Sequence, residues 1–478
     1  MIISTEALTY FFLIFCGIYN GFLFLSFLWF SVGYSFFAII KTNRSKNEIV
    51  DQDHSLPFIT IIIPLLNEEK VIENSLSQLL NMPYEGRLEI LGVDDHSSDN
   101  TPLILSNFGR NNNRLLYLLR GKNRSRMGKG DVLNHGYQYL RYQKFPSRDP
   151  GNWVIGVFDA DGRPVEKDFF SEVGGLFLNP EVAAVQCGVR IRNTSRLLPA
   201  LQDVEFTTFS FITQTVRDKT SGAVALGGNG QFIRASTLDG IMFDGKYWDT
   251  SALTEDLEIG TRILLSGGRI RFIKRWISQE GVETGRALIK QRIRWAWGSL
   301  QVFLRYVVSG KIFRSSIPLR RKIDLHYYLS FWIVPFVVLL TLLVFIFDKA
   351  DIVTVKNGFG LKFLIINSFS FIPLVLTGLA WAGIKLWKIL YLAPLSILYT
   401  YHWVPVLMIA LLKIVTGAKP YWMKTERYEM YLPEKDYSID AKMKLGEILV
   451  DMGFCTPDLI EKALEQQGND QKGKMLGQ

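Results

Sequence analysis

The chain has 478 residues and a net charge of +9, with 54 Lys and Arg against 45 Asp and Glu. Four segments contain no Asp, Glu, Lys or Arg, and each reaches the roughly 20 residues that a bilayer core requires: 10–40, 325–347, 363–384 and 389–412. A purely soluble protein is therefore excluded. The three scattered cysteines also exclude a disulfide framework. Much of the positive charge flanks the apolar segments, which favours a membrane surface over a nucleic acid as partner.

The first apolar segment predicts a transmembrane anchor, because it lacks the basic start and the short length of a cleavable signal peptide. Lys41, Arg44 and Lys46 follow it, so the positive-inside rule places its C-terminal end in the cytosol. Basic residues on both sides of 389–412 predict that both of its ends are cytosolic, and its two prolines could break it into a re-entrant hairpin. A full crossing, which would leave the C-terminus outside, is the alternative. We therefore expect a multi-pass protein of the inner or plasma membrane, with the polar part of the chain in the cytosol.

From residue 58 onward, apolar β-branched runs alternate with helical patterns, which indicates an α/β domain with a mostly parallel sheet. The predicted strands are 58–63, 88–93, 115–119 and 153–158, and the predicted helices between them are 68–80, 100–108 and 129–142. Parallel sheets of this kind bind ligands beyond the carboxyl ends of their strands. Clusters of polar residues fall at those positions.

Two acidic pairs each follow a predicted strand. Asp94 and Asp95 could accept hydrogen bonds from a base or sugar, or could form an Asx turn that caps the next helix. Asp159 and Asp161 are separated by one residue, and alternate residues of a strand point the same way. Together with diphosphate oxygens, the second pair could hold Mg²⁺ or Mn²⁺.

A third acidic pair and a lysine stand at predicted helix starts. Glu255 and Asp256 precede a helical run at 257–265, where a carboxylate could act as a general base or simply as a first-turn acid. Lys129 could bind phosphate, although a solvated lysine is the usual reading of such a residue.

The segment 285–308 predicts a basic amphipathic helix that lies in the bilayer interface or packs on the sheet. Its apolar stripe contains Ile293, Trp297, Leu300, Leu304 and Val307. The motif QRIRW at 291–295 could bind a sugar on its tryptophan and phosphate on its arginine, or could anchor the helix at the interface.

In this order, the motifs resemble those of processive family 2 glycosyltransferases, the membrane synthases of hyaluronan, cellulose, chitin and poly-N-acetylglucosamine. The resemblance covers about 58–300 and rests on PLLNE at 64–68, VDDHSSDNT at 93–101, Lys129, DAD at 159–161, GGNG at 227–230, TED at 254–256 and QRIRW. It implies a GT-A fold and inverting transfer from a nucleotide sugar, with UDP favoured, to a growing polysaccharide that is exported. Single transfer to a lipid-phosphate carrier and a non-catalytic binding module are the alternatives.

The resemblance also implies roles for individual residues. Those expected at the nucleotide sugar are Asn67, Glu68, Asp94, Asp95, Lys129 and Asp159. Asp161 and Asp159 would hold the metal, and Asp256, beside Glu255, would be the catalytic base. The residues expected at the diphosphate and acceptor are Gln291, Arg294, Trp295, Gly228 and Asn229. Because four helices are few for a channel, we also expect a homo-oligomer or a partner subunit.

The C-terminal segment 444–467 resembles the repeat of the MshEN-type N-terminal domain of type II secretion ATPases, which in tandem can bind cyclic di-GMP. The residues expected at such a regulatory nucleotide are Lys444, Leu445, Gly446, Gly453 and Gln467. Lys444 stands where the repeat usually has Arg, and docking on the catalytic domain is the alternative role. A synthase followed by this unit also resembles, more loosely, bacterial phage adsorption protein B.

The predicted organisation has six parts. They are an N-terminal anchor (1–46), a cytosolic GT-A domain (47–284), an amphipathic region (285–320), a C-terminal transmembrane block (321–416), a basic linker (417–443) and the MshEN-like unit (444–478).

Overall fold

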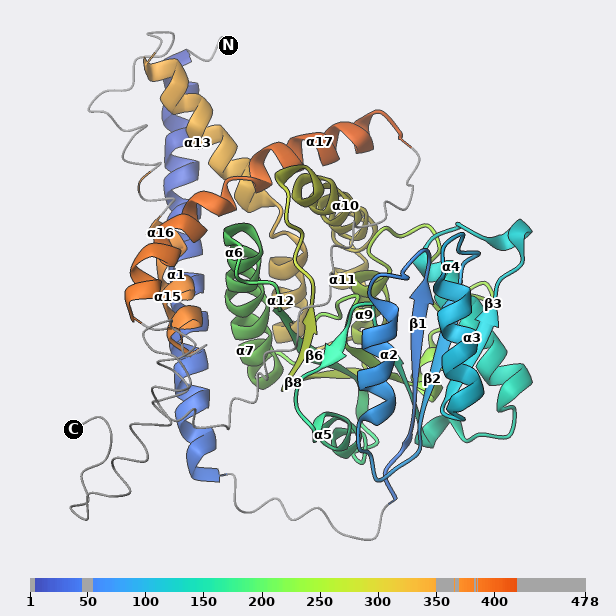
Figure 1. Cartoon of the computed structure of the whole chain (residues 1–478). Coiled ribbons are helices and arrows are strands. Elements are labelled where there is room, and N and C mark those ends of the chain that lie inside the picture. Colours follow the sequence, from blue (N-terminus) through green and yellow to red (C-terminus); the bar gives the residue numbers. More distant parts are fainter. Residues whose placement is uncertain are drawn as a thin grey trace, which may run out of the picture. The chain divides into compact units, whose positions relative to one another are not determined.

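The computed structural model describes residues 5–44, 55–349, 365, 369–381, 384 and 386–418 (Figure 1). The predicted MshEN-like unit, with Lys444, Leu445, Gly446, Gly453 and Gln467, lies outside the described residues, as does nearly all of the basic linker. Control by cyclic di-GMP therefore stays a prediction.

A sheet of eight strands forms the centre of the described chain, in the order β3-β2-β1-β4-β7-β6-β8-β5. Strands β1 to β4 are parallel neighbours, as the alternating pattern predicts. Strand β7 runs antiparallel to β4 and β6, so the far half of the sheet is mixed. The strands are β1 (Phe58–Leu65), β2 (Leu88–Asp94), β3 (Leu115–Leu119), β4 (Trp153–Val157), β5 (Arg163–Pro164), β6 (Val182–Ile191), β7 (Gln231–Arg234) and β8 (Arg269–Gln279).

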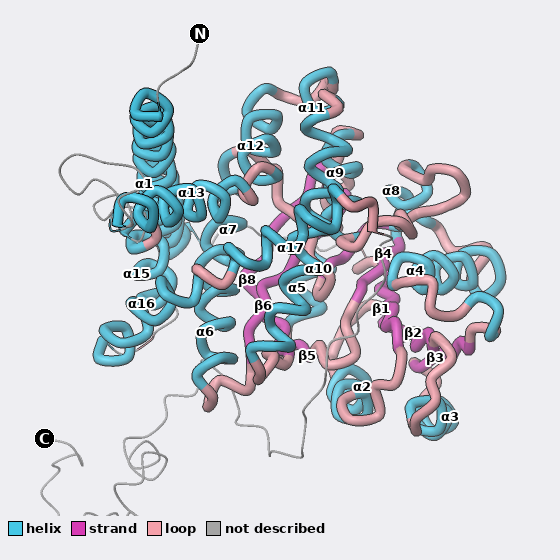
Figure 2. Tube along the Cα trace, turned by 90° about the horizontal axis from the view of Figure 1, so that it is seen from above, coloured by secondary structure: helices cyan, strands magenta, loops and turns pink. Residues whose placement is uncertain are grey.

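Helices cover both faces of this sheet, which explains why β1 is apolar at nearly every position. Ile59 and Ile61 pack into a core with helices α2, α3 and α5, whereas Ile62 packs into a core with α4, α7 and α9. Figure 2 shows α2 and α3 on one side of β1–β3 and α4 on the other. These helices are α2 (Ile72–Asn81), α3 (Thr101–Asn111), α4 (Lys129–Gln138), α5 (Phe169–Leu176), α7 (Thr213–Thr220), α8 (Ala235–Gly240) and α9 (Glu255–Leu265).

One long helical run changes its winding in the middle. It consists of α6 (Leu197–Glu205), the π-helical segment η4 (Phe206–Ile212) and α7. Helix α15 (Ile372–Trp381) packs against η4. A side chain at Gly378 of α15 would collide with Thr208 of η4, so only a glycine permits this close approach of the two helices.

Two helices of the described chain are long and apolar enough to cross a membrane. They are Gly17–Phe37, within α1 (Thr5–Arg44), and Trp387–Val415, which joins α16 (Leu386–Thr400) and α17 (Trp403–Val415). Helices α12 (Leu319–Leu329) and α13 (Ile333–Lys349) form a third span if the 47° bend between them lies within one crossing. Of the predicted segment 363–384, the described part contains the ten residues of α15.

Helix α10 (Gly285–Phe303) continues into the π-helical segment η5 (Leu304–Val308), and α11 (Lys311–Arg314) follows. The part of the predicted stripe that lies in α10 is buried, but its partner is α17 rather than the sheet (Figure 1). Farther along, in η5, Leu304 is 43% exposed. Ile293, Trp297 and Leu300 share a core cluster with Val406 and Leu407. The stripe therefore joins the sheet-bearing part of the chain to one of the candidate membrane helices.

Candidate active site

The ammonium group of Lys129 lies where three predicted motifs meet. Its Nζ donates to Asp159 Oδ1 at 2.7 Å and to the carbonyl oxygen of Gly228 at 2.9 Å. It also lies 3.7 Å from Glu255 Oε1. Lys129 opens α4, Asp159 follows β4, and Glu255 opens α9, so the topology of the sheet brings together segments as far apart in the chain as positions 129 and 255.

The backbone at Gly228 lies close to both the lysine and the predicted base. A Cβ atom at Gly228 would lie 3.1 Å from Lys129 Nζ and 3.3 Å from Asp256 Oδ2. Asp256 Oδ1 accepts a hydrogen bond of 2.8 Å from the N–H of Leu257, which leaves Oδ2 directed toward Gly228. The TED carboxylates, the GGNG loop and Lys129 therefore lie close together.

Burial sets the charge state of this site. Burial, together with the neighbouring Asp256, raises the pKa of Glu255 to about 7 against the lowering effect of Lys129. Burial also raises the pKa of Asp256. For Lys129, burial would lower the pKa, but Asp159 and Glu255 outweigh that effect and raise it. Lys129 is therefore protonated, whereas Glu255 and Asp256 hold a proton more readily than exposed carboxylates do.

Arg294 is the second cation near the TED carboxylates. Its charge lowers the pKa of Glu255 and of Asp256, although burial and the other carboxylates outweigh it. The Nε atom of Arg294 is buried and has no hydrogen-bond partner among the described residues. This arginine therefore lies near enough to the carboxylates to act with Lys129 on a negatively charged substrate.

Four of the residues predicted at the nucleotide sugar line one cavity of about 50 Å³: Glu68, Asp95, Lys129 and Asp159. Asp95 is bound from two sides, by Arg120 Nη1 at 2.5 Å and by the N–H of Arg126 at 2.9 Å. Arg120 is buried and also pairs with Asp131. Arg120 was not predicted, although its position just beyond β3, at the same edge of the sheet, could have indicated it.

Asp94 and Asn67 support the loops around that cavity. Asp94 is fully buried, and its Oδ1 accepts from the N–H of Ser97 at 2.9 Å, three residues on. The Asx turn before α3 is made by Asp99 instead, whose Oδ1 accepts from the N–H of Thr101 at 3.0 Å. Asn67 has a φ of 55° and accepts from the N–H of Ser98 at 2.7 Å through its side-chain oxygen. This turn at Asn67 precedes α2, which begins at Ile72 rather than at the predicted residue 68.

The two carboxylates of the DAD motif differ in exposure. The side chain of Asp159 is 33% exposed, whereas Asp161 is buried and its Oδ2 accepts from the N–H of Glu280 at 2.9 Å. Asn229, predicted at the acceptor, stabilises this turn, because its Oδ1 accepts from the N–H of Asp159 at 3.3 Å.

A divalent cation would need further ligands at this motif. Within the described ranges, no group of three or more His, Cys, Asp and Glu side chains is placed to hold a metal ion. The DAD carboxylates supply the hard oxygen ligands that Mg²⁺ and Mn²⁺ prefer. They fit such an ion only when donor phosphate oxygens complete the coordination.

Arg292 of the QRIRW motif contacts both α6 and α16. Gln291 accepts from Arg292 Nη1 at 2.6 Å, and Arg292 Nη2 pairs with Glu205 at 2.6 Å. The guanidinium of Arg292 lies over the ring of Trp295, 4.0 Å from its centroid. Glu205 also accepts from Tyr399 of α16 at 2.9 Å. Glu205 and Tyr399 were not predicted, because no local signal connects positions 194 residues apart.

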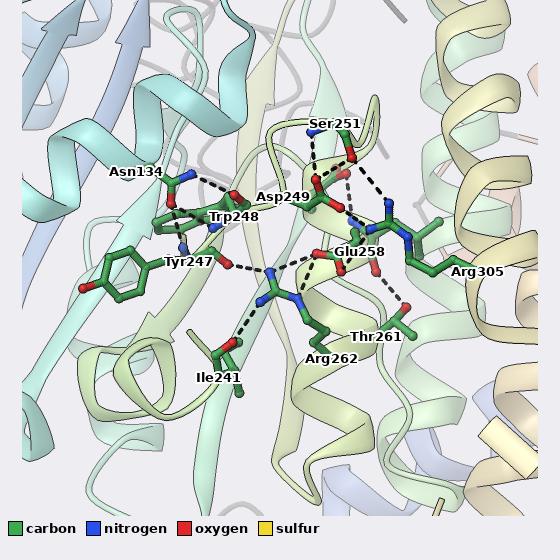
Figure 3. A network of polar contacts seen from close by, with 12 residues as sticks. Asn134, Ile241, Tyr247, Trp248, Asp249, Ser251, Glu258, Thr261, Arg262 and Arg305 are labelled. Atoms are coloured by element: carbon green, nitrogen blue, oxygen red, sulfur yellow. Dashed lines mark hydrogen bonds and ion pairs between the residues drawn. The ribbon is translucent and has the colours of Figure 1, made fainter. Parts of the chain in front are cut away.

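A polar network behind the site fixes α9 (Figure 3). Asn134 of α4 donates to the carbonyl of Trp248 at 2.7 Å, which ties the helix of Lys129 to the loop before α9. Glu258, one turn along α9, pairs with Arg262 at 2.9 Å and lies 3.7 Å from Arg305. The contact of Glu258 with Arg305 ties the start of α9, and with it the TED carboxylates, to η5.

Comparisons with known proteins identify the family and the fold of this chain. The chain matches the family described as glycosyltransferase like family 2 over residues 57–298. It belongs to this family. In fold, it is similar to the mannosyltransferase PcManGT from Pyrobaculum calidifontis, solved with GDP-Man and Mn²⁺, with a TM-score of 0.58 and 18% identity over 85% of this chain and 99% of that one. The predicted GT-A fold is therefore confirmed.

The proteins of similar sequence include enzymes with three different names. The chain is 31% identical to β-monoglucosyldiacylglycerol synthase of Trichormus variabilis, over 55% of this chain and 53% of that protein. It is 30% identical to poly-β-1,6-N-acetyl-D-glucosamine synthase of Staphylococcus aureus, over 59% and 64%. It is 27% identical to the probable glycosyltransferase YdaM of Bacillus subtilis, over 79% and 88%. The chain thus spans about half the length of the first of these relatives.

Proposed function

We propose that this chain transfers a sugar from a nucleotide-sugar donor to an acceptor hydroxyl at a membrane, with Asp256 as the general base. The observation that carries the proposal is the position of Lys129, which binds Asp159 and Gly228 and lies beside Glu255. A buried cation among groups from three motifs suits a diphosphate on one side and a base on the other.

The acceptor oxygen would attack the anomeric carbon from the face opposite the leaving group. A new carbon–oxygen bond forms, the bond to the diphosphate oxygen breaks, and the proton of the acceptor passes to the Asp256 carboxylate. Lys129 and Arg294 would stabilise the negative charge that develops on the leaving nucleoside diphosphate. One carboxylate base without a carboxylate nucleophile favours direct displacement with inversion, by analogy with glycoside hydrolysis.

Burial makes Asp256 a better base than an exposed aspartate, because its pKa is raised toward the working pH. Glu255 has a pKa of about 7 and therefore carries a proton part of the time at neutral pH. A shared proton lets the pair avoid two adjacent buried negative charges. Glu255 would thus help Asp256 to remain ionised before the acceptor binds.

The donor would lie over the cavity lined by Glu68, Asp95, Lys129 and Asp159. Asp159 and Asp161 would hold Mg²⁺ or Mn²⁺ together with the donor's diphosphate. When bound, such an ion neutralises the charge of the leaving group. The sequence analysis favours a UDP sugar, and the fold neighbour was solved with GDP-Man and Mn²⁺, so both nucleotides belong in a test of the donor.

The proposal has two versions, which differ in the acceptor. The sequence analysis favours a growing polysaccharide that is exported through the chain's own helices. The other version is a single transfer to a membrane lipid. The relatives include a poly-β-1,6-N-acetyl-D-glucosamine synthase, whose name corresponds to the first version. They also include a β-monoglucosyldiacylglycerol synthase, whose name corresponds to the second.

The base is tested by Asp256→Asn in the full-length protein. We expect donor binding to persist and sugar transfer to fall by about 100- to 10,000-fold, the range that general-base catalysis supplies. Binding is measured by calorimetry with the donor, and transfer by release of nucleoside diphosphate. The matched control is Asp244→Asn, in an exposed loop, which should keep wild-type activity. An Asp256→Asn variant that transfers at the wild-type rate would show that the base is another group.

A further inference from the structure

The segment that follows α10 and η5 exposes apolar and basic side chains together. From 311 to 323 the sequence contains five Lys and Arg residues and no Asp or Glu. Three large apolar side chains of this segment, Phe313, Leu319 and Ile323, are between 61% and 75% exposed. The segment consists of α11, a turn and the first part of α12. Exposed apolar side chains that lie together mark a surface that binds another molecule.

The exposed groups of this segment lie on one face. Leu319 and Ile323 are four residues apart on α12 and are therefore neighbours on its surface, with Lys322 beside them. Lys322 Nζ donates to the carbonyl oxygen of Phe313 at 2.9 Å, which holds the end of α11 against this part of α12. Arg321 does not belong to the face, because it donates to the turn after α9. The basic-apolar face is defined by the following residues: Lys311, Phe313, Arg314, Leu319, Arg320, Lys322 and Ile323.

The other side of α12 packs against the rest of the chain. Leu329 is buried there and lines a cavity of about 340 Å³ between the sheet-bearing part of the chain and the candidate membrane helices. The lining of this larger cavity is mostly apolar, and its charged residues among those described are Glu205 and Arg217. Glu205 pairs with Arg292 at 2.6 Å, and Arg217 pairs with Asp324 of α12 at 2.9 Å. This packing fixes which side of α12 is left for the basic-apolar face.

Contacts with α1 give the depth of this face. The hydroxyls of Tyr327 in α12 and Ser26 in α1 are hydrogen-bonded at 3.1 Å, near the middle of the apolar span Gly17–Phe37. Helix α13 continues from there along the N-terminal half of α1 (Figure 1), so the start of α12 lies toward the C-terminal end of α1. Leu319 precedes Tyr327 by eight residues, which is about 12 Å of helix. The basic-apolar face therefore lies near the level at which the apolar span ends.

This position and composition fit the surface of a membrane leaflet. At the end of a span, apolar side chains reach the hydrocarbon while Lys and Arg reach the phosphate groups. A nucleic acid would bind the cations through its phosphates but would leave the apolar side chains in water. Helix α10, which the sequence predicted for this interface, is packed on α17 instead. The surface that meets the leaflet therefore follows α10 in the chain.

We propose that the basic-apolar face inserts its three apolar side chains into the leaflet at the C-terminal end of α1 and binds the headgroups of anionic phospholipids with its four cations. Each Lys or Arg at such a surface favours an anionic lipid over a neutral one by about fivefold, before screening by salt. The inference is independent of the proposed function, because it concerns no step of sugar transfer.

The first test is Phe313→p-benzoylphenylalanine, a photoreactive replacement, in the full-length protein. The protein is placed in nanodiscs with equal amounts of phosphatidylglycerol and phosphatidylcholine, and mass spectrometry identifies the adducts formed on irradiation. We expect lipid adducts, with phosphatidylglycerol at least about fivefold in excess. The matched control is the same replacement at Phe243, which is 78% exposed but lies in the loop after α8 and should give few lipid adducts.

Three outcomes of this experiment would overturn the proposal. Adducts of position 313 with a second copy of the chain, or no adduct with lipid, would show that the face does not meet the leaflet. Equal yields from the two lipids would show that the partner is not anionic. Equal yields of lipid adducts from positions 313 and 243 would show that the membrane does not distinguish this face from an exposed loop.

The second test neutralises the cations of the face in the protein with the photoreactive group at position 313. The four substitutions are Lys311→Gln, Arg314→Gln, Arg320→Gln and Lys322→Gln. We expect the preference for phosphatidylglycerol to fall at least about fivefold, while lipid adducts persist because the apolar side chains remain.

The matched control for this variant removes four exposed cations of the sheet-bearing part of the chain and should keep the wild-type preference. Its substitutions are Arg110→Gln, Lys122→Gln, Lys144→Gln and Lys167→Gln. An unchanged preference in the variant of the basic-apolar face, or an equal loss in both variants, would contradict the proposal.

A third measurement covers the case in which the fourfold variant does not fold. At about 1 M salt the Debye length is only about 3 Å, so the preference of the protein with all its cations should shrink at least about threefold. A preference that stays the same from low salt to about 1 M salt would argue against headgroup binding by these cations.

Discussion

The two cavities of this protein differ in the charged residues of their walls. The smaller one, of about 50 Å³, has Glu68, Asp95, Lys129 and Asp159 on its walls. The larger one, of about 340 Å³, has paired charges within an apolar lining. In the first, an incoming diphosphate would take over the contacts that Lys129 makes with Asp159. In the second, the charged pairs stabilise the walls and leave the space itself to apolar groups.

The two cavities also differ in how the chain builds them. The smaller one is formed at the ends of β1, β2 and β4 and at the start of α4, so parallel-sheet topology dictates its position. The larger one depends on contacts such as that of Glu205 with Trp403, which are 198 positions apart. The first is therefore a property of a local fold, and the second is a property of how helices pack on it.

The largest effect is expected from Lys129→Met, which changes the charge of the smaller cavity. Removing a buried partner leaves Asp159 and Glu255 without their cation, at a cost of about 3 to 5 kcal/mol. We expect donor turnover to fall by more than about 100-fold, measured as release of nucleoside diphosphate. Lys122→Met, at an exposed position, should have little effect. Retention of turnover by Lys129→Met would remove the lysine from the donor site.

The pH dependence should separate activity from stability. The pKa of Glu255 is about 7, above its usual 4.5, and that of Asp256 is also raised. Transfer should therefore fall as the pH is lowered, because Asp256, the proposed base, is protonated at a higher pH than an exposed aspartate. Stability should change in the opposite direction, because a raised carboxyl pKa stabilises the fold fully below about pH 4.5 and this contribution is lost as the pH rises through 7.

The stability half of this prediction is measured as the melting temperature between pH 5 and 8, with Glu255→Gln as the control. The wild-type melting temperature should fall as the pH rises, and the variant should show a smaller fall. If both proteins melt at one temperature over the whole range, Glu255 does not titrate near pH 7.

A smaller effect is expected from a substitution at Glu205, which lines the larger, apolar cavity. Glu205→Gln would remove the charge that neutralises the fully buried Arg292, so the protein should melt several degrees lower. The KM for the acceptor should rise about 5- to 10-fold, with an unchanged KM for the donor. Glu181→Gln is the matched control, because its side chain is 75% exposed and its ion pair with Arg269 spans 3.9 Å. A shifted donor KM in Glu205→Gln would mean that the cavities are not independent.

The mildest change is Gly228→Ala. The new methyl group would lie 3.1 Å from Lys129 Nζ and 3.3 Å from Asp256 Oδ2, so both groups must shift by a few tenths of an ångström. We expect a loss in kcat of a few fold with little change in melting temperature. Gly240→Ala, where a Cβ meets nothing within 4 Å, serves as the control. An equal loss in both variants would point to backbone effects rather than to crowding at the site.

The first half of the sheet could be predicted from the sequence, because β1, β2 and β4 are buried on both faces and read as apolar runs. The second half could not. Strand β7 has only four residues and pairs antiparallel on both sides, so it lacks a periodic signal of its own. Its place in the sheet follows from its neighbours and not from its composition.

The site shows the same limit. The positions of Lys129, Asp159 and Asp256 were indicated by motifs at strand ends and helix starts, and the structure brings Lys129 and Asp159 into contact. The functions of Asp94 and Asn229 as turn-holding residues depend on backbone N–H groups, which the sequence does not distinguish. The contacts of Glu205 require tertiary packing and could not have been predicted from any local pattern.

The close approach of Gly378 to Thr208 has a consequence for where the reaction takes place. Because α15 and η4 touch without an intervening side chain, α15 is fixed to the helical run formed by α6, η4 and α7. Helix α15 itself adjoins the candidate membrane helices. The catalytic groups would then stay at a constant depth relative to the hydrocarbon layer. Bilayers of different thickness should change how far an embedded substrate must rise to meet them.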